Sequence, residues 1–225
     1  MTIKVLFEDN HLLVVEKPVN IPVQGDISKD MDLLSYFKLY IKDKYNKPGD
    51  VYLGLVHRLD RPVGGVMVFA RTSKAASRLS EQIRGREMQK TYLAVTEGKF
   101  NIKQGTYIDY LWKDRKSNQV KVVSQGFNDG RKAILHYEVL DERNNMALVG
   151  INLETGRSHQ IRVQLSYNGH PVIGDKKYGG MGRGFTDNLA LWSYKLTFRH
   201  PVKDEIISIT SIPPANKPWD IFSIN

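Results

Sequence analysis

An acidic residue lies in a loop between two apolar segments of the sequence. Asp60 follows a predicted strand over residues 51–55 and precedes another over 66–70, and its loop also holds Arg58 and Arg61. The loop ends in a glycine pair, which permits unusual backbone angles and close approach, so it can present a side chain into a cleft. The pattern fits equally an aspartate that caps its own loop or pairs with a neighbouring arginine.

A second polar segment, over residues 153–162, is expected to turn from a strand into a helix. Ser158 or Thr155 is expected to cap that helix, whose first amides favour an anion. Arg162 lies about 100° round the helix from Ile161, at the flank of the apolar stripe, and can reach a half-buried carboxylate there. The alternative is a surface arginine whose stem lies along apolar residues.

The remaining candidates are an aromatic residue and the histidines. Tyr92 lies on a predicted strand over 91–96, where a tyrosine is usually part of the core. The histidines at 57, 136 and 159 do not have the spacing of metal ligands, so no metal site is expected. Cysteine is absent, which excludes thiolate metal sites and a thiol nucleophile.

Length and composition predict one α+β domain over residues 1–225. The chain has 41% hydrophobic and 25% charged residues, as in ordinary soluble globular proteins. No apolar segment is long enough to span a membrane, and the first residues do not form a signal peptide, so a cytoplasmic protein is expected. We predict a mixed, mainly antiparallel sheet flanked by two or three helices.

The pattern of apolar residues places these elements along the chain. Helices are expected over 31–44 and from Ser73 or Lys74 to Arg84, with a shorter one from about 158 to 168. Strands are expected over 4–7, 12–15, 51–55, 66–70, 91–96, 106–111, 119–123, 133–140, 147–153, 189–197 and 205–209. Asp30 or Asp32 is expected to cap the first helix.

The chain carries a formal net charge of +9, which favours a polyanionic partner. Residues 71–90 and 113–132 each hold six Lys or Arg against two acidic residues, and these runs flank the Asp60 loop and the Tyr92 strand. Such charge is often only a solvated surface, and it is compatible with DNA, RNA or an anionic membrane.

Four blocks in one order carry a family resemblance: His57-Arg58-Leu59-Asp60 with Gly65; Lys90-x-Tyr92-Leu93-Ala94; Thr155-Gly156-Arg157-Ser158-His159-Gln160-Ile161-Arg162; and Gly169-His170-Pro171-Val172-Ile173-Gly174-Asp175-x-x-Tyr178-Gly179. The chain thereby resembles RNA pseudouridine synthases of the RluA type. The resemblance runs from about Leu6, through Glu16-Lys17-Pro18, to Pro214, and it implies a pseudouridine-synthase-like fold.

The resemblance implies three catalytic residues. Asp60 corresponds to the aspartate that attacks the target uridine, at either C1′ of the ribose or C6 of the uracil. Tyr92 corresponds to the tyrosine that stacks on the uracil and has been assigned proton transfer at C5. Arg162 corresponds to the arginine that pairs with the catalytic carboxylate and keeps it ionised.

The resemblance also implies how substrate is bound. Arg58 corresponds to a residue that enters the RNA stack and holds the target base out, and His57, Arg157 and Lys90 are expected to contact substrate. The reaction requires no cofactor and no metal. We expect a monomer that acts on a stem–loop of rRNA or tRNA, without the S4-type domain found in many relatives.

Two positions depart from the family pattern. After Asp60 the chain has Val63-Gly64-Gly65 where the family usually has Thr-Ser-Gly, so a hydroxyl role there is lost. Asn20 stands where the Lys-Pro motif usually has glycine. Two other functions compete with the synthase: a catalytically inactive RNA-binding module of the same fold, and a metal-free ribonuclease with His57 and His159 as acid and base.

Overall fold

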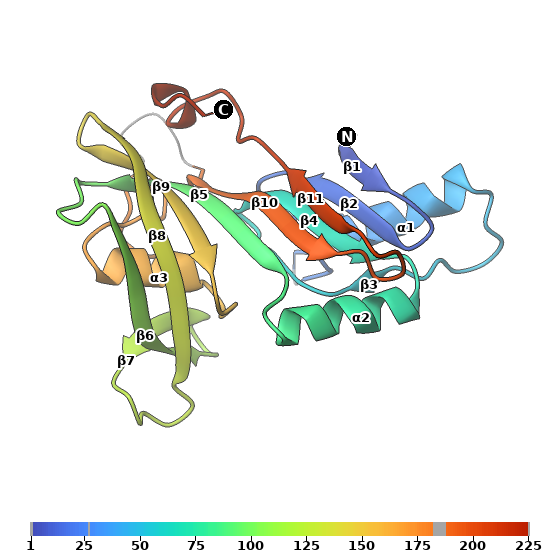
Figure 1. Ribbon diagram of the computed structural model, residues 1–225, viewed down its shortest axis with the longest axis horizontal. Helices are drawn as coiled ribbons and strands as arrows, with labels where there is room; N and C mark the ends of the chain where they lie inside the picture. The colour runs from blue at the N-terminus through green and yellow to red at the C-terminus, as the bar shows by residue number, and fades with distance from the viewer. Residues whose placement is uncertain (1, 27, 182–187, 225) are drawn as a thin grey trace. The chain divides into compact units, whose positions relative to one another are not determined.

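The chain, described by a computed structural model over residues 2–26, 28–181 and 188–224, divides into two compact units (Figure 1). The first unit comprises Met1–Gln89 and Ser193–Ser211. The second comprises Lys90–Trp192 and Ile212–Asn225. That the whole chain acts as one catalytic domain over residues 1–225 stays a prediction.

The first unit is a sheet with two helices. Its elements are β1 (Val5–Glu8), β2 (Leu12–Lys17), α1 (Leu33–Lys44), β3 (Gly54–Leu55), β4 (Gly64–Ala70), α2 (Ser73–Arg84), most of β10 (Leu191–Arg199) and β11 (Ile206–Thr210). The strand order is β1-β2-β4-β10, with β3 paired to β4 and β11 paired to β10. The pairs β1–β2, β2–β4, β3–β4 and β10–β11 are antiparallel.

The two helices cover opposite faces of this sheet. Val66, Val68 and Ala70 of β4 belong to the apolar cluster that contains Ala75 and Leu79 of α2. The intervening Phe69 lies 6.1 Å, centroid to centroid, from Phe37 of α1. Because side chains alternate along a strand, α1 and α2 lie on different sides. Every residue of β4 is buried, as expected for a strand covered on both faces.

The second unit is an antiparallel sheet with one helix. Its elements are β5 (Gln89–Glu97), β6 (Gln104–Asp114), β7 (Gln119–Val123), β8 (Arg131–Arg143), β9 (Met146–Leu153), α3 (Gln160–Tyr167) and the short 3-10 helix η1 (Trp219–Ile221). The strand order is β5-β9-β8-β6-β7. Val163 of α3 packs on a cluster formed by Leu111, Val120 and Ala133. None of the helices described in either unit is long and apolar enough to cross a membrane.

The predicted α+β class with a mainly antiparallel sheet is confirmed, and most elements lie where their patterns place them. Helix α1 begins at Leu33, after Asp32, whose carboxylate accepts the Ser35 backbone N–H at 2.9 Å. The predicted strand over 51–55 is wrong for its first three residues. Gly54 pairs with Ala70, the last residue of β4, and the two strands are antiparallel. Residues 51–53 would therefore have to pair beyond the end of β4, where the chain already turns into α2.

The predicted cap of α3 is also wrong. His159 occupies the cap position with a left-handed φ of 52° and makes no capping hydrogen bond through its side chain. The Thr155 hydroxyl is engaged elsewhere, because it accepts the backbone N–H of Ile134 at 2.8 Å and donates to Oε1 of Gln160 at 2.9 Å. The Gln160 side chain therefore organises the turn that a Ser or Thr cap was expected to close.

Candidate active site

A tight turn in the first unit carries Asp60. The backbone N–H of Val63 donates to the Asp60 carbonyl oxygen at 3.0 Å, which closes the turn over 60–63. Leu59 and Val63 on either side are buried, whereas Asp60 is half-buried. The apolar neighbours thus anchor the turn and keep the carboxylate near the surface.

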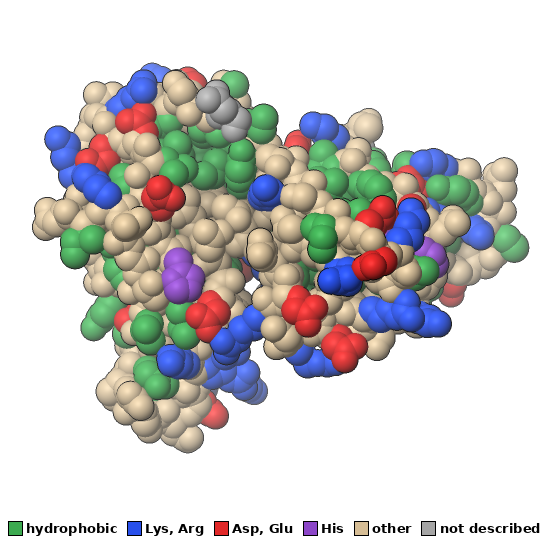
Figure 2. All heavy atoms as spheres, viewed as in Figure 1, with side chains coloured by type: hydrophobic (Ala, Val, Ile, Leu, Met, Phe, Trp, Pro, Cys, Tyr) green, Lys and Arg blue, Asp and Glu red, His purple; other side chains and the backbone are tan. Residues whose placement is uncertain are grey.

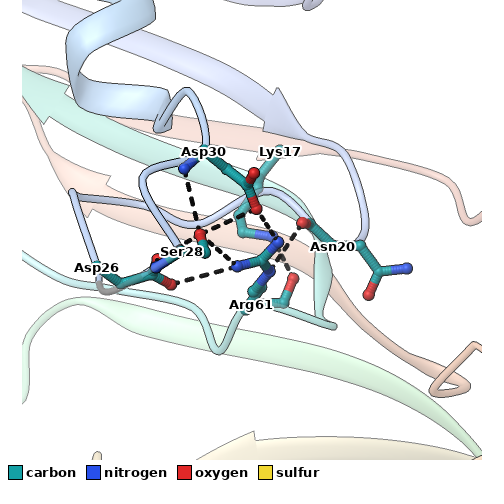
Figure 3. Close-up of polar contacts among 6 residues, drawn as sticks. All are labelled: Lys17, Asn20, Asp26, Ser28, Asp30 and Arg61. Carbon is teal, nitrogen blue, oxygen red and sulfur yellow. Dashed lines mark hydrogen bonds and ion pairs between the residues drawn. The ribbon is translucent and has the colours of Figure 1, made fainter.

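A buried lysine that the sequence pattern does not single out as functional holds this turn. The Lys17 side chain, at the end of β2, is fully buried, which is rare for lysine. Its Nζ donates to the carbonyl oxygens of Pro18 at 2.8 Å and Val63 at 2.8 Å. It also donates to the carbonyl oxygen of Arg61 at 2.9 Å (Figure 3). Two of these three acceptors belong to the turn that begins at Asp60.

Opposing effects act on the protonation of the Lys17 side chain. Burial lowers the pKa of Lys17 to about 7, and the charge of Arg61 also lowers this pKa, while the negative charge of Asp60 raises it. An ammonium group has three N–H donors, and a neutral amine has two. The three carbonyl contacts therefore require the charged form, and loss of the proton removes one of them.

Arg61 ties the same turn to a neighbouring segment. Its Nε donates to the Asn20 carbonyl oxygen at 3.1 Å, and its Nη1 donates to Ser28 Oγ at 3.0 Å and to Asp26 at 3.4 Å (Figure 3). Its Nη2 forms an ion pair with Asp30. Exposed ion pairs contribute at most about 1 kcal/mol each, so it is the network as a whole that holds Asn20, Asp26, Ser28 and Asp30 against the turn.

The two departures from the family pattern have clear structural outcomes. Asn20 has a left-handed φ of 63°, a conformation that glycine favours and asparagine tolerates. Gly65 has a φ of +112°, and a Cβ atom there would lie 2.2 Å from the Ser193 carbonyl oxygen. The glycine is therefore required for the close approach of β4 and β10, whereas Val63 supplies a buried apolar anchor in place of a hydroxyl.

The two residues at 57 and 58 differ in their surroundings. The Val68 backbone N–H donates to Nε2 of His57 at 3.1 Å, so the neutral ring carries its proton on Nδ1. Arg58 is exposed. His57 thus has a structural hydrogen bond at one nitrogen, while substrate contact by His57 and Arg58 and the ribonuclease alternative stay predictions.

The second unit holds the other sequence-predicted site residues, two of them on β5. Tyr92 is buried and lies opposite Ile151 of β9. Lys90 is half-buried, and burial lowers the pKa of its ammonium group. The roles of Tyr92 on the uracil and of Lys90 in substrate contact stay predictions.

Arg162 on α3 is buried, so the surface alternative is wrong for this residue. Its Nε donates to Oδ2 of Asp175 at 2.7 Å, and its Nη2 donates to Oδ1 of Asp175 at 2.7 Å. The guanidinium carbon lies 5.1 Å from the centre of the Tyr178 ring. Arg162 thus has a fully buried carboxylate partner within its own unit, rather than a half-buried one, and pairing with Asp60 stays a prediction.

A basic and aromatic surface lies on the same unit, and we call it the strand face. Trp112 of β6 is opposite Lys121 of β7, and Tyr110 of β6 is opposite Lys132 of β8. Arg157, which is exposed, donates from Nε to the Lys132 carbonyl oxygen at 3.0 Å. The four strand side chains point away from the face of the sheet that packs on α3, because they alternate with Leu111, Val120 and Ala133.

Positive charge is not confined to one patch. The surface drawn in Figure 2 carries Lys and Arg side chains interspersed with Asp and Glu. Among the described residues, no group of three or more His, Asp or Glu side chains has the arrangement of a metal site.

Comparison with known proteins gives consistent matches. The family described as RNA pseudouridylate synthase matches residues 11–167. An uncharacterized RNA pseudouridine synthase of Bacillus subtilis is 35% identical, over 94% of this chain and 69% of its own length. Ribosomal large subunit pseudouridine synthase D of Xanthomonas campestris is 36% identical, over 94% of this chain and 66% of its own length.

A third relative and two solved structures extend these matches. Ribosomal large subunit pseudouridine synthase C of Buchnera aphidicola is 33% identical, over 78% of this chain and 54% of its own length. The chain thus spans between 54% and 69% of these three relatives. Human RNA pseudouridylate synthase domain containing 4 has a TM-score of 0.78 at 25% identity, over 93% of this chain and 88% of its own. Human RNA pseudouridylate synthase domain containing 1 shares the fold, with a TM-score of 0.75 at 22% identity, over 98% of this chain and 87% of its own.

Proposed function

Because the chain belongs to the RNA pseudouridylate synthase family, in its RluA-type branch, we propose that it isomerises uridine in a structured RNA to pseudouridine with Asp60 as the nucleophile. Members of this family are isomerases. The observation that carries the proposal is the half-buried Asp60 on a turn held by Lys17, at the position of the family's catalytic aspartate.

The reaction balances without any other reactant. The N1–C1′ bond of uridine breaks, the uracil turns while it stays bound, and a C5–C1′ bond forms. The proton on C5 is released and N1 gains one, so substrate and product have the same atoms. Asp60 attacks C1′ or C6 to start the sequence and is regenerated at its end, and therefore no oxidant, reductant or metal is consumed.

Two residues of the second unit support this chemistry in the proposal. The Tyr92 ring stacks on the turning uracil, and its hydroxyl serves the proton transfer at C5. Arg162 supplies N–H donors to the carboxylate of Asp60 and keeps it ionised, as a nucleophile must be. Both assignments rest on the match of Tyr92 and Arg162 to the family motifs.

Binding of RNA is assigned to basic and aromatic side chains. The strand face offers Lys121 and Lys132 to phosphates and Trp112 to an unstacked base. Arg157 and Lys90 add phosphate contacts, and His57 contacts the substrate beside Asp60. Arg58, exposed and two residues before Asp60, holds the target base out of its stack, since extrusion of a base costs a few kcal/mol.

The substrate class is a stem–loop of rRNA, with tRNA as the second choice. Two of the relatives are named ribosomal large subunit pseudouridine synthases, which favours rRNA. The enzyme acts as a monomer in the cytoplasm in this proposal.

The test uses unmodified large-subunit rRNA and tRNA transcripts labelled with tritium at C5 of uridine. Pseudouridine formation releases the label to water and leaves RNA length unchanged. Release from one transcript without strand cleavage is the expected result. Binding without release would indicate an inactive RNA-binding module, and shortened RNA would indicate a ribonuclease; either outcome overturns the proposal.

A further inference from the structure

We propose that Asp175 and Tyr178 are positioning residues that fix the guanidinium of Arg162 in the orientation that the reaction requires. This inference rests on the proposed function, in which Arg162 serves the nucleophilic carboxylate. It concerns only residues of the second unit. The sequence motifs that contain Asp175 and Tyr178 do not by themselves assign either residue a role.

Asp175 holds one edge of the guanidinium. The ion pair is bidentate, with both N–O distances at 2.7 Å, and the side chains of Arg162 and Asp175 are 8% and 0% exposed. A bidentate pair fixes the plane of the guanidinium as well as its distance, which a single contact does not. Both side chains are also shielded from solvent, so water does not compete for the contact.

The backbone around Asp175 is itself constrained. Its N–H donates to the Val172 carbonyl oxygen at 3.0 Å, and its carbonyl oxygen accepts the N–H of Gly180 at 2.9 Å. A Cβ atom at Gly180 would lie 1.8 Å from the Val172 carbonyl oxygen, so the turn closes only with glycine there. Oδ1 of Asp175 also accepts the N–H of Tyr178 at 3.2 Å. The carboxylate is therefore held in place by its own loop.

Tyr178 holds the face of the guanidinium. Its ring lies under Arg162, with the guanidinium carbon 5.1 Å from the ring centre, a cation–π geometry. Its hydroxyl oxygen accepts the Val120 backbone N–H at 3.0 Å and hydrogen-bonds Nδ1 of His159 at 2.7 Å. Ser166 Oγ donates to its carbonyl oxygen at 2.6 Å. The ring is thus fixed from β7 and from α3.

These contacts determine how Arg162 can act on a second carboxylate. Asp175 takes the edge formed by Nε and Nη2, and the Nη1 donors project from another edge of the same planar group. The Arg162–Asp175 pair is neutral as a whole, so a second carboxylate is stabilised by directed N–H donors rather than by net charge. The orientation of the Arg162 guanidinium therefore determines the rate of the chemical step, whereas the affinity for RNA does not depend on this orientation.

The test is a double-mutant cycle on the single-turnover rate, measured by tritium release with saturating RNA. Asp175→Asn keeps the shape of the side chain and removes its charge, and Arg162→Lys keeps the charge and removes the planar group. We expect D175N to lower the rate constant about 10- to 100-fold, as small misplacements of catalytic groups do, with RNA affinity unchanged. In the R162K background, the same change should lower the rate less than about threefold, because coupled residues are not additive.

Glu142→Gln is the matched control. In the same unit, Glu142 pairs with Lys103 at 2.6 Å and accepts the Phe100 backbone N–H at 2.8 Å. Both partners precede β6, and neither belongs to the group formed by Arg162, Asp175 and Tyr178. We expect E142Q to stay within about twofold of the unaltered enzyme, since its partner Lys103 is 57% exposed and loss of such a pair is a small perturbation.

Several outcomes overturn the inference. D175N at the unaltered rate, or an equal loss in both backgrounds, would show that Asp175 does not act through Arg162. If D175N does not fold, Tyr178→Leu replaces it, because this change removes the ring and keeps Asp175, and the same non-additivity with R162K is expected. An unaltered enzyme that forms no pseudouridine in either RNA would overturn the proposed function instead, and the inference with it.

Discussion

The ammonium group of Lys17 donates a hydrogen bond to the carbonyl oxygen of Val63 at 2.8 Å, 46 residues further along the chain. This contact joins the end of β2 to the turn that carries Asp60. A buried cation is costly unless all its donors are satisfied, and here backbone carbonyl oxygens satisfy them. The position of the candidate nucleophile thus depends on a residue that does not itself react.

Replacing Lys17 tests this dependence. In Lys17→Met the carbonyl oxygens of Pro18, Arg61 and Val63 lose their donor, and the turn is no longer held to β2. We expect the single-turnover rate to fall at least about 10-fold through misplacement of Asp60. Lys4→Met, which removes an exposed lysine 3.8 Å from Glu16, is the control and should have no effect. A K17M enzyme as fast as K4M would contradict the positioning role.

The protonation of Lys17 predicts a pH dependence of stability. Its pKa is lowered to about 7 in the folded chain, from an ordinary value of 10.5. Between these values the unfolded chain binds more protons, so the Lys17 contribution to the free energy of unfolding rises with pH, by up to about 1.4 kcal/mol per pH unit. Below pH 7 both states are protonated and this contribution is flat.

Denaturant unfolding of the unaltered protein and of K17M, compared at intervals from about pH 6 to about pH 10, measures this contribution. The stability difference should change in favour of the unaltered protein above pH 7. A midpoint near the ordinary value of 10.5 in the Cε chemical shift of Lys17 would argue against a lowered pKa.

Gly65 is predicted to be irreplaceable for the fold. Gly65→Ala places a Cβ atom 2.2 Å from the Ser193 carbonyl oxygen at a left-handed φ. Gly126→Ala has a φ of +92° with nothing within 4 Å, so it is a control for backbone strain alone. We expect G126A to lose about 1 kcal/mol and G65A to lose several kcal/mol more than that. If both variants lose the same free energy of unfolding in urea, the fold does not require the close approach of β4 and β10 at Gly65.

The strand face is predicted to contribute to RNA affinity. Each phosphate contact releases counterions, so the double variant Lys121→Ala/Lys132→Ala should bind RNA more weakly and reduce the slope of log K against log salt by about 1 to 2. Lys42→Ala, on α1, is the control outside the strand face. Titrations at several salt concentrations make the measurement. An unchanged slope of log K against log salt in the double variant would show that the RNA does not bind at the strand face.

Local patterns predict most elements and the turn around Asp60. The apolar stripe of α2 predicts a helix from Ser73 or Lys74 to Arg84, and the helix is confirmed with its start at Ser73. Gly65 is part of the motif that follows Asp60, and its φ and its contact with Ser193 give the reason for glycine at that position.

Other features depend on contacts that no local pattern specifies. Lys17 satisfies its charge with backbone carbonyl oxygens, which every residue type offers, so its sequence neighbours do not reveal its role. The partner of Arg162 within its unit, Asp175, follows 13 residues later, after α3 has ended. The predicted cap of α3 is wrong because the Gln160 side chain, rather than the N-terminal amides, engages Thr155.

The central claim is that Asp60 is the nucleophile of uridine isomerisation. The most direct test is the single-turnover tritium release from C5-labelled RNA by Asp60→Asn, at RNA concentrations where binding by the variant has been shown to equal that of the unaltered enzyme. The account predicts a rate at least about 10⁴-fold lower, as for loss of other enzyme nucleophiles, with the RNA bound and intact. Release by D60N within about 10-fold of the unaltered rate would contradict it.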